Sequence, residues 1–287
     1  MCIMKIAVVT ASGIGDGLIL HIASHNLVQM EHEVITFNDH LAGFGEWFRG
    51  YSFSNQPLLF AQFDAVILQH DNSPKAKQIR ALDLPVYTFY GSHQVSKHGA
   101  LRDTDYVANP NQTMVDNITK AMEKWFGVAS KENGMTPLAG LVHRKYPSRV
   151  AIHTTSGARE KNWPQEKFYH VAKKLQNMGY DPVFINEPGG RPIFASLEDL
   201  ASFIYESGAF LGNDSGPGHI ASYLKIPSLI IGKEEKQMRL WRPGWMAPEV
   251  LTPPAWSAHW KWTRNKWKHF ITTRSVIKTL KCKVLKN

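Results

Sequence analysis

The stretch GNDSGPGHIASYLKIPSLIIG, residues 212–232, places acidic, hydroxyl and glycine residues at the start of a short apolar helix. A helix N-terminus has free N–H groups and about half a unit of positive charge, so phosphate oxygens bind there. Ser215 adds a hydroxyl donor, and Gly216 lets a ligand approach the backbone closely. Asp214 would repel phosphate, but it can accept hydrogen bonds from a sugar or ribose hydroxyl. His219, taken alone, is more often a structural histidine than a ligand.

A second candidate loop, TTSGAREKNWPQEKF (154–168), follows a strand-like run and precedes a helix. Its hydroxyl and cationic side chains are Thr154, Thr155, Ser156, Arg159 and Lys161. Hydroxyls and cations at the carboxyl end of a strand suit a diphosphate. The alternative is a solvated loop in which Glu160 neutralises the cations.

A third loop, TASGIGDGL (10–18), lies between the first strand-like run and a helical pattern. Its candidate residues are Ser12, Gly13, Gly15 and Asp16. A dinucleotide-binding fingerprint would need a third glycine where Leu18 stands, which argues against a nicotinamide enzyme. Asp16 has two interpretations: a helix N-cap, or a base that takes a proton from a hydroxyl group.

Strand-like and helix-like stretches alternate around these loops, which predicts parallel sheets covered by helices on both faces. In the first half the strand-like runs are 5–11, 33–38, 63–69 and 84–90, and the helical runs are 16–30 and 111–126. In the second half the strand-like runs are 148–155, 181–186, 209–214 and 227–232, and the helical runs are 163–179, 196–208 and 218–225. Residues 127–140, GVASKENGMTPLAG, are the expected linker. We therefore expect domains at 1–138 and 139–255, followed by a segment at 256–287.

The excess of positive charge is local. The chain of 287 residues has a net charge of +9, and nine Lys or Arg residues without any acid lie in 256–287. The rest of the chain is balanced, which argues against nucleic acid as a partner. No run approaches the roughly 18 apolar residues of a membrane span. The start of the chain does not resemble a signal sequence, and two distant cysteines do not form a disulfide framework, so we expect a cytoplasmic protein.

Six of the nine tryptophans lie between 241 and 267. The spacing of Trp256, Trp260 and Trp267 would place them on one face of a helix. Two interpretations stay open and could hold in different parts of the segment: 256–287 packs back across both domains, including the N-terminal domain, or it docks on an anionic membrane surface, with tryptophans at the headgroups.

The three loops, in this order, resemble the motifs of the family 9 glycosyltransferases, the lipopolysaccharide heptosyltransferases. SLEDLASFIYESGAFLGNDSGPGHIASYLKIPSLIIG is similar to the donor-domain signature of that family, TTSGAREKNWPQEKFYHVAKKL to its hydroxyl, Lys, Trp and Pro loop, and ASGIGDGLIL to its Ser-x-x-Gly-Asp motif on the acceptor side. The resemblance implies a GT-B fold, with two Rossmann-like doubly wound parallel-sheet domains facing a cleft. It also implies an inverting, metal-independent transfer, most often of heptose from ADP-heptose, to a lipid-linked glycan acceptor at the inner face of the cytoplasmic membrane.

The resemblance also implies roles for single residues. Asp16, with Ser12, Gly13 and Gly15 beside it, would be the base on the acceptor side, and Lys161 would offset charge on the leaving diphosphate. The donor residues would be Thr154, Thr155, Ser156, Arg159, Glu187, Asp214, Ser215, Gly216 and His219. No metal and no cofactor are expected, because no aspartate pair suited to a diphosphate-bound ion appears. Two alternatives remain: the same fold using another nucleotide-sugar, and a catalytically silent nucleotide-sugar or glycan binding protein.

Overall fold

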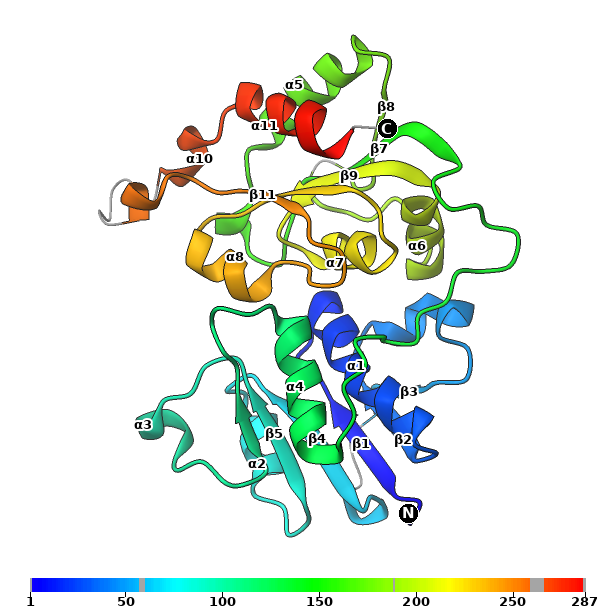
Figure 1. Cartoon of the computed structure of the whole chain (residues 1–287), viewed down its shortest axis with the longest axis vertical. Helices are drawn as coiled ribbons and strands as arrows, with labels where there is room; N and C mark the ends of the chain where they lie inside the picture. The colour runs from blue at the N-terminus through cyan, green and yellow to red at the C-terminus, as the bar shows by residue number, and fades with distance from the viewer. Residues whose placement is uncertain (1, 57–59, 188, 259–265, 286–287) are drawn as a thin grey trace. The chain divides into compact units, whose positions relative to one another are not determined.

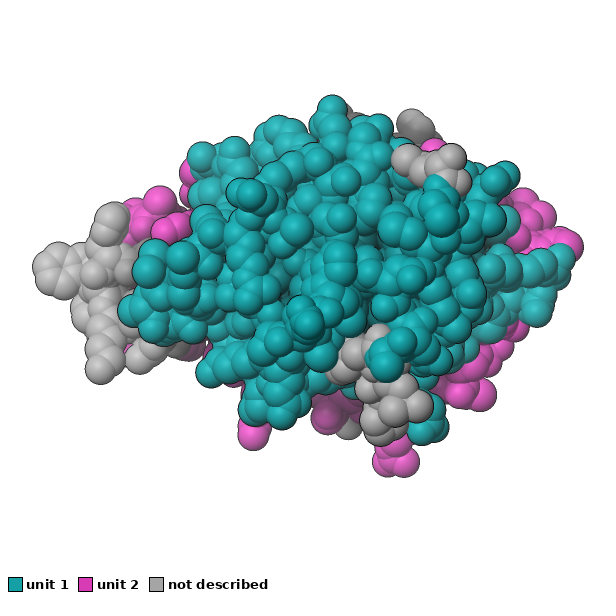
Figure 2. Space-filling model, turned by 90° about the horizontal axis from the view of Figure 1, so that it is seen from below, with its two compact units in different colours: residues 1–136 teal, residues 137–287 magenta. Residues whose placement is uncertain are grey.

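The computed structural model describes residues 2–56, 60–187, 189–258 and 266–285. The chain forms two compact units, unit 1 at residues 1–136 and unit 2 at residues 137–287, which Figure 2 colours teal and magenta. Each unit is built around its own sheet, and every strand pair in the described residues is parallel. This confirms the expected fold class of two doubly wound α/β domains.

The sheet of unit 1 has the strand order β3-β2-β1-β4-β5-β6. Its strands are β1 (Lys5–Val9), β2 (Glu33–Phe37), β3 (Ser52–Ser54), β4 (Ala65–His70), β5 (Val86–Tyr90) and β6 (Asp105–Val107). Its helices are α1 (Ile14–Gln29), η1 (Leu41–Phe48), η2 (Phe60–Gln62), α2 (Pro74–Arg80), α3 (Val95–His98) and α4 (Met114–Phe126). The central strands β1 and β4 are almost continuously apolar and buried, as strands covered on both faces must be.

The two faces of this sheet bury alternate side chains of the same strands. Ala7 and Val9 of β1 belong to a cluster with Ile79 of α2. Because side chains alternate across a strand, Ile6 and Val8 lie on the other face. Helix α1 contacts β1, and α1 and α4 pack side by side (Figure 1).

The sheet of unit 2 has the strand order β11-β10-β9-β7-β8. Its strands are β7 (Tyr146–His153), β8 (Asp181–Phe184), β9 (Ser207–Asn213), β10 (Ser228–Ile231) and β11 (Glu249–Leu251). Its helices are η3 (Arg159–Lys161), α5 (Gln165–Gln176), α6 (Leu197–Tyr205), α7 (Gly216–Tyr223), α8 (Glu235–Trp241), η4 (Ala255–Ala258), α10 (Trp267–Phe270), α11 (Thr273–Thr279) and η5 (Leu280–Val284).

Most of the expected linker at 127–140 is packed on unit 1. Helix α4 ends at Gly127 in the left-handed conformation, and the chain then returns along α1. Asn26 donates to the Ser130 carbonyl at 3.0 Å, and Thr136 donates its N–H to the Trp47 carbonyl at 2.8 Å. The compact part of unit 1 therefore extends through residue 136, and the connection to unit 2 begins at Pro137.

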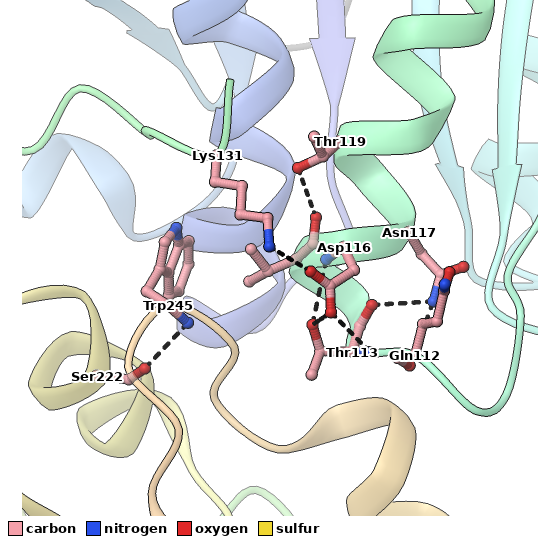
Figure 3. Close-up of polar contacts among 9 residues, drawn as sticks. Gln112, Thr113, Asp116, Asn117, Thr119, Lys131, Ser222 and Trp245 are labelled. Carbon is pink, nitrogen blue, oxygen red and sulfur yellow. Dashed lines mark hydrogen bonds and ion pairs between the residues drawn. The ribbon is translucent and has the colours of Figure 1, made fainter. Parts of the chain in front are cut away.

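An ion pair adds to this attachment, and Figure 3 shows its two side chains pointing toward one another. The Lys131 ammonium lies 2.6 Å from the Asp116 carboxylate in the first turn of α4. Asp116 also forms a capping box with Thr113. Burial by itself would raise the pKa of Asp116, but the hydrogen bonds from Lys131 and Thr113 outweigh it and hold the pKa below its usual value.

The C-terminal segment does not form the expected tryptophan face. Trp267 is 2% exposed and belongs to the core of unit 2, whereas Trp256 is 54% exposed on η4. The two side chains therefore face different surroundings, and Trp260 lies outside the described residues. Helix α11 packs beside α5 (Figure 1). The expected packing of this segment on the N-terminal domain stays a prediction.

In the described part of the chain, no helix combines the length and the apolar character that crossing a bilayer requires.

A buried histidine of α1 makes the stability of unit 1 sensitive to pH. The His21 side chain is fully buried, and its Nδ1 lies 2.6 Å from the Asn133 carbonyl. Burial lowers the pKa of His21 to about 4, and the bond to Asn133 only partly offsets this. From about pH 6.5 down to about 4, the unfolded chain therefore binds the proton and the folded protein does not.

We expect the free energy of unfolding to fall as the pH drops below about 6.5, with up to about 1.4 kcal/mol per pH unit from His21. Urea titrations between pH 7.5 and 5 measure this slope. A His21→Gln variant should be less stable at pH 7.5 but show a shallower slope. Equal slopes in the two proteins would contradict the assignment.

Candidate functional site

The loop after β1 holds Asp16 in a fixed position. Helix α1 begins at Ile14 with Gly13 as its N-cap, so Asp16 lies in the first helical turn and its interpretation as the N-cap is wrong. The half-buried carboxylate accepts a hydrogen bond of 2.7 Å from the Gln69 amide at the end of β4. The Gln69 oxygen accepts in turn from the Ala11 N–H at 3.3 Å. Gln69 thus links the carboxylate to the loop that precedes it.

Asn38 fixes the other side of this loop from the end of β2. Its amide donates to the Thr10 hydroxyl at 2.7 Å and to the Ala11 carbonyl at 3.1 Å. A Cβ atom at Gly17 would lie 2.8 Å from the Asn38 nitrogen, so only glycine permits this approach. Gln69 and Asn38 were not predicted from the sequence; the available signal was a polar residue at the carboxyl end of each neighbouring strand.

The remaining predicted residues of this loop lie beside Asp16. Ser12 is exposed, and Gly13 and Gly15 are half-buried. The structure therefore brings the predicted acceptor-side residues together at the carboxyl edge of the unit 1 sheet. Their role toward an acceptor stays a prediction.

In unit 2, two buried asparagines hold the loop after β7. Asn186, which follows β8, accepts from the Thr154 N–H and donates to its hydroxyl, both at 2.9 Å. Asn213, at the end of β9, donates to the Thr154 carbonyl at 2.7 Å and accepts from the Trp163 N–H at 2.9 Å. The ends of three strands are therefore joined at Thr154, which is itself only 2% exposed. Thr154 was predicted from the sequence to contact the ligand, whereas the two asparagines were not predicted.

A cavity of about 810 Å³ opens beside this loop. It is lined by Thr154, Thr155, Ser156, Gly157, Arg159, Asn162, Trp163, Pro164, Gln165, Gly189, Gly190 and Lys268. Four predicted donor residues thus share one cavity at the N-terminus of α5. Its charged lining residues, Arg159 and Lys268, are both cations, and the described lining contains no acid. The cavity therefore suits an anionic ligand.

A second group of predicted residues meets at the N-terminus of α7. The Lys161 ammonium lies 4.0 Å from the Asp214 carboxylate. Ser215 occupies the N-cap position without a capping bond from its side chain, and Gly216 is the first helical residue. The Ser215 hydroxyl instead lies 3.0 Å from Nδ1 of His153.

His153 is neutral at physiological pH. Burial lowers the pKa of His153 to about 4, against a smaller opposing effect of a backbone hydrogen bond at Thr155. The neutral ring can either donate a hydrogen bond to the Ser215 hydroxyl or accept one from it. It therefore orients that hydroxyl at the start of α7 without adding charge.

His219 and Glu187 lie outside the lining of the cavity. His219 is 5% exposed, and burial lowers the pKa of His219 to about 4. Its Nδ1 has no hydrogen-bond partner among the described residues. Glu187 pairs with Arg191 at 2.8 Å, in the turn that carries Gly189 and Gly190. The predicted donor contacts of both residues stay predictions.

Within residues 2–56, 60–187, 189–258 and 266–285, no group of three or more His, Cys, Asp or Glu side chains could hold a metal ion.

We expect Asn213→Ala to destabilise unit 2 by about 3 kcal/mol, because it leaves the buried Trp163 N–H and Thr154 carbonyl without their partner. Asn213→Asp keeps an acceptor for the Trp163 N–H but loses the donor to the Thr154 carbonyl. We therefore expect its loss of unfolding free energy to differ from that of Asn213→Ala. Urea unfolding measures both values. A change under about 0.5 kcal/mol in Asn213→Ala would show that the link is unimportant.

No protein-family model matches the chain, and no curated protein sequence matches it.

Solved structures do match over nearly the whole chain. A family 9 glycosyltransferase from Veillonella parvula is 18% identical, with a TM-score of 0.69, over 99% of this chain and 98% of the other. The E. coli heptosyltransferase WaaC, solved with ADP, is 14% identical, with a TM-score of 0.68, over 97% and 99%. The E. coli ADP-heptose lipopolysaccharide heptosyltransferase II is 15% identical, with a TM-score of 0.64, over 98% of each chain.

At this identity the likeness concerns the fold. The resemblance inferred from three short motifs is therefore confirmed at that level: this chain has the GT-B fold of the family 9 glycosyltransferase structures.

Proposed function

We propose that the protein is an inverting glycosyltransferase that transfers a sugar from a nucleotide-sugar, with ADP-heptose as the first candidate, to a lipopolysaccharide-core or related surface-glycan acceptor. The observation that carries the proposal is the arrangement in unit 2. Cations, hydroxyls and two helix N-termini gather at the carboxyl ends of β7 and β9, beside a cavity whose charged lining is entirely positive. Such a site fits the diphosphate of a nucleotide-sugar. The shared fold with two heptosyltransferases supports the choice of sugar.

The donor diphosphate would contact the loop residues Thr154, Thr155, Ser156 and Arg159 together with Lys161, Ser215 and Gly216. The last three come from the second group, where α7 presents its N-terminus. Asp214, His219 and Glu187 would shape the surroundings of the sugar and the ribose. Asp214 holds Lys161 while no anion is present, because the two side chains form an ion pair.

In the proposed reaction the acceptor hydroxyl oxygen forms a bond to the anomeric carbon, and the bond from that carbon to the diphosphate oxygen breaks. The Asp16 carboxylate takes the proton of the hydroxyl. Gln69 orients this carboxylate through its hydrogen bond. The departing diphosphate carries the electron pair away, and Lys161 with the α7 N-terminus stabilises its charge. Displacement in one step inverts the anomeric carbon.

We also propose that the transfer needs no divalent metal. Lys161 and the N-terminus of α7 can supply the charge that a metal would otherwise provide. The Asp-x-Asp pair of the chain, Asp103 and Asp105, lies in unit 1, where Asp105 is buried against Arg80 at 2.8 Å. Activity should therefore survive exhaustive treatment with a chelator.

The proposed place of action is the inner face of the cytoplasmic membrane, in peripheral contact with anionic lipid. The nine basic residues of 256–287 and the exposed Trp256 support this part of the proposal.

The donor can be identified by thermal-shift measurements with ADP-, UDP-, GDP- and CDP-sugars. We expect the ADP compound to stabilise the protein most, by about 2.7 kcal/mol at a hundredfold excess over Kd, without magnesium. A shift with only UDP- or GDP-sugars would assign another donor to the same fold. The absence of any shift would contradict a nucleotide-sugar site.

The proposed base is tested by Asp16→Asn. We expect donor affinity to stay within about threefold, while the transfer rate falls by a factor of about 10² to 10⁴. Asp39→Asn, at an exposed aspartate after β2, is the matched control and should keep its rate. If the unchanged protein binds donor but does not transfer the sugar to any lipid A-type acceptor, the result favours the alternative of a nucleotide-sugar binding protein.

A further inference from the structure

The C-terminal segment contributes a cation to the cavity of unit 2. We infer that Lys268 binds the diphosphate of the donor and that the segment around it is part of the donor site. This inference rests on the function proposed above. It assigns to residues 266–271 a role that is distinct from a purely structural or membrane contact.

The charge of the cavity supports a role for Lys268 in binding an anion. Arg159 and Lys268 are its charged lining residues among those described, and they come from positions more than a hundred residues apart in the chain. Lys268 is half-buried, whereas Lys278 and Lys281 of the same segment are exposed. A cation held at a cavity without an acid in its described lining attracts an anion more strongly than one on an open surface, because water screens it less.

Hydrogen bonds anchor the segment around Lys268 to the loop beside the cavity. The Trp267 side chain is buried in the core, and its indole N–H donates to the Glu160 carbonyl at 3.2 Å. The Trp163 indole N–H donates to the Ile271 carbonyl at 3.1 Å. Residues on both sides of Lys268 are therefore bonded to the loop that carries the proposed phosphate contacts.

The half-buried ammonium group of Lys167 completes this anchoring. Lys167 of α5 donates to the carbonyls of Lys268, at 2.7 Å, and Ile271, at 3.1 Å. Burial lowers the pKa of Lys167, with a smaller opposing effect of Glu166. Lys167 therefore acts as a positioning residue: it fixes the backbone from which the Lys268 side chain reaches the cavity.

The size and lining of the cavity also fit a nucleoside diphosphate. Its volume of about 810 Å³ lies in the range of sites that enclose small organic ligands and cofactors. The hydroxyls of Thr155 and Ser156 and the turn at Gly189 and Gly190 share this cavity with Lys268. A nucleoside diphosphate bound there would meet Lys268 from the C-terminal segment and Arg159 from the loop.

The test uses the full chain with the variants K268Q, K268R and K278Q, each titrated with ADP by calorimetry. K268Q removes the charge and leaves a slightly shorter polar side chain, so we expect its melting temperature without ligand to be unchanged and its ADP affinity to fall about tenfold. K268R should bind ADP within about threefold of the unchanged protein. K278Q, at an exposed lysine of α11, should bind ADP normally.

Two results would overturn the inference and leave the proposed function standing: K268Q binds ADP as tightly as the unchanged protein, or K278Q loses as much affinity as K268Q. If another nucleoside diphosphate binds best in the donor screen, the same titrations are made with that compound. If the unchanged protein binds none of them, the proposed function fails and the inference fails with it.

Discussion

The hydrogen bonds that Asn186 and Asn213 make to Thr154 are the interaction on which the arrangement of unit 2 depends. Parallel strands bring their carboxyl ends to one edge, but the loops that follow have no sheet bonds to order them. The two buried amides replace those bonds, since they bond to the N–H, the carbonyl and the hydroxyl oxygen of Thr154. Asn213 also accepts from the Trp163 N–H, just before α5. The residues between 154 and 163 are thereby held at both ends, which places Thr155, Ser156 and Arg159 around one cavity.

Unit 1 uses the same device with different residues. Asn38 holds the loop after β1 from one neighbouring strand, and Gln69 holds it from the other. The difference lies in what each loop presents: a carboxylate in unit 1, and cations with hydroxyls in unit 2. In the proposed reaction these are complementary tasks, because the hydroxyl must lose a proton while the diphosphate gains charge. Amides suit both scaffolds, since they bond strongly without adding charge of their own.

Strand and helix alternation and the loop motifs could be predicted from the sequence, because both are local. The scaffold residues could not, since Asn186 and Asn213 become partners only when β8 and β9 lie on either side of β7. The start of α1 was misjudged for a local reason: Gly13 takes the N-cap position although aspartate is the better capping residue. The tryptophan spacing in 256–267 was read as one helical face, but burial in the core decided the place of Trp267. Lys268 carries no motif, and only the packing of the segment brings it to the cavity.

The charges of unit 2 also bear on the proposed donor site. Lys161 is 34% exposed and lies beside Asp214, so its charge is partly compensated inside the protein. Arg159 is exposed, and Lys268 is half-buried, so water solvates them in the free protein. A bound diphosphate would displace that water, and the same cations would then interact in a medium of lower dielectric constant. The segments that carry these cations are already held by the hydrogen bonds at Thr154, Trp163 and Lys268. In the proposed reaction, little reorganisation is therefore required when charge develops on the leaving oxygen, and this is the condition under which fixed cations could take the place of a metal ion.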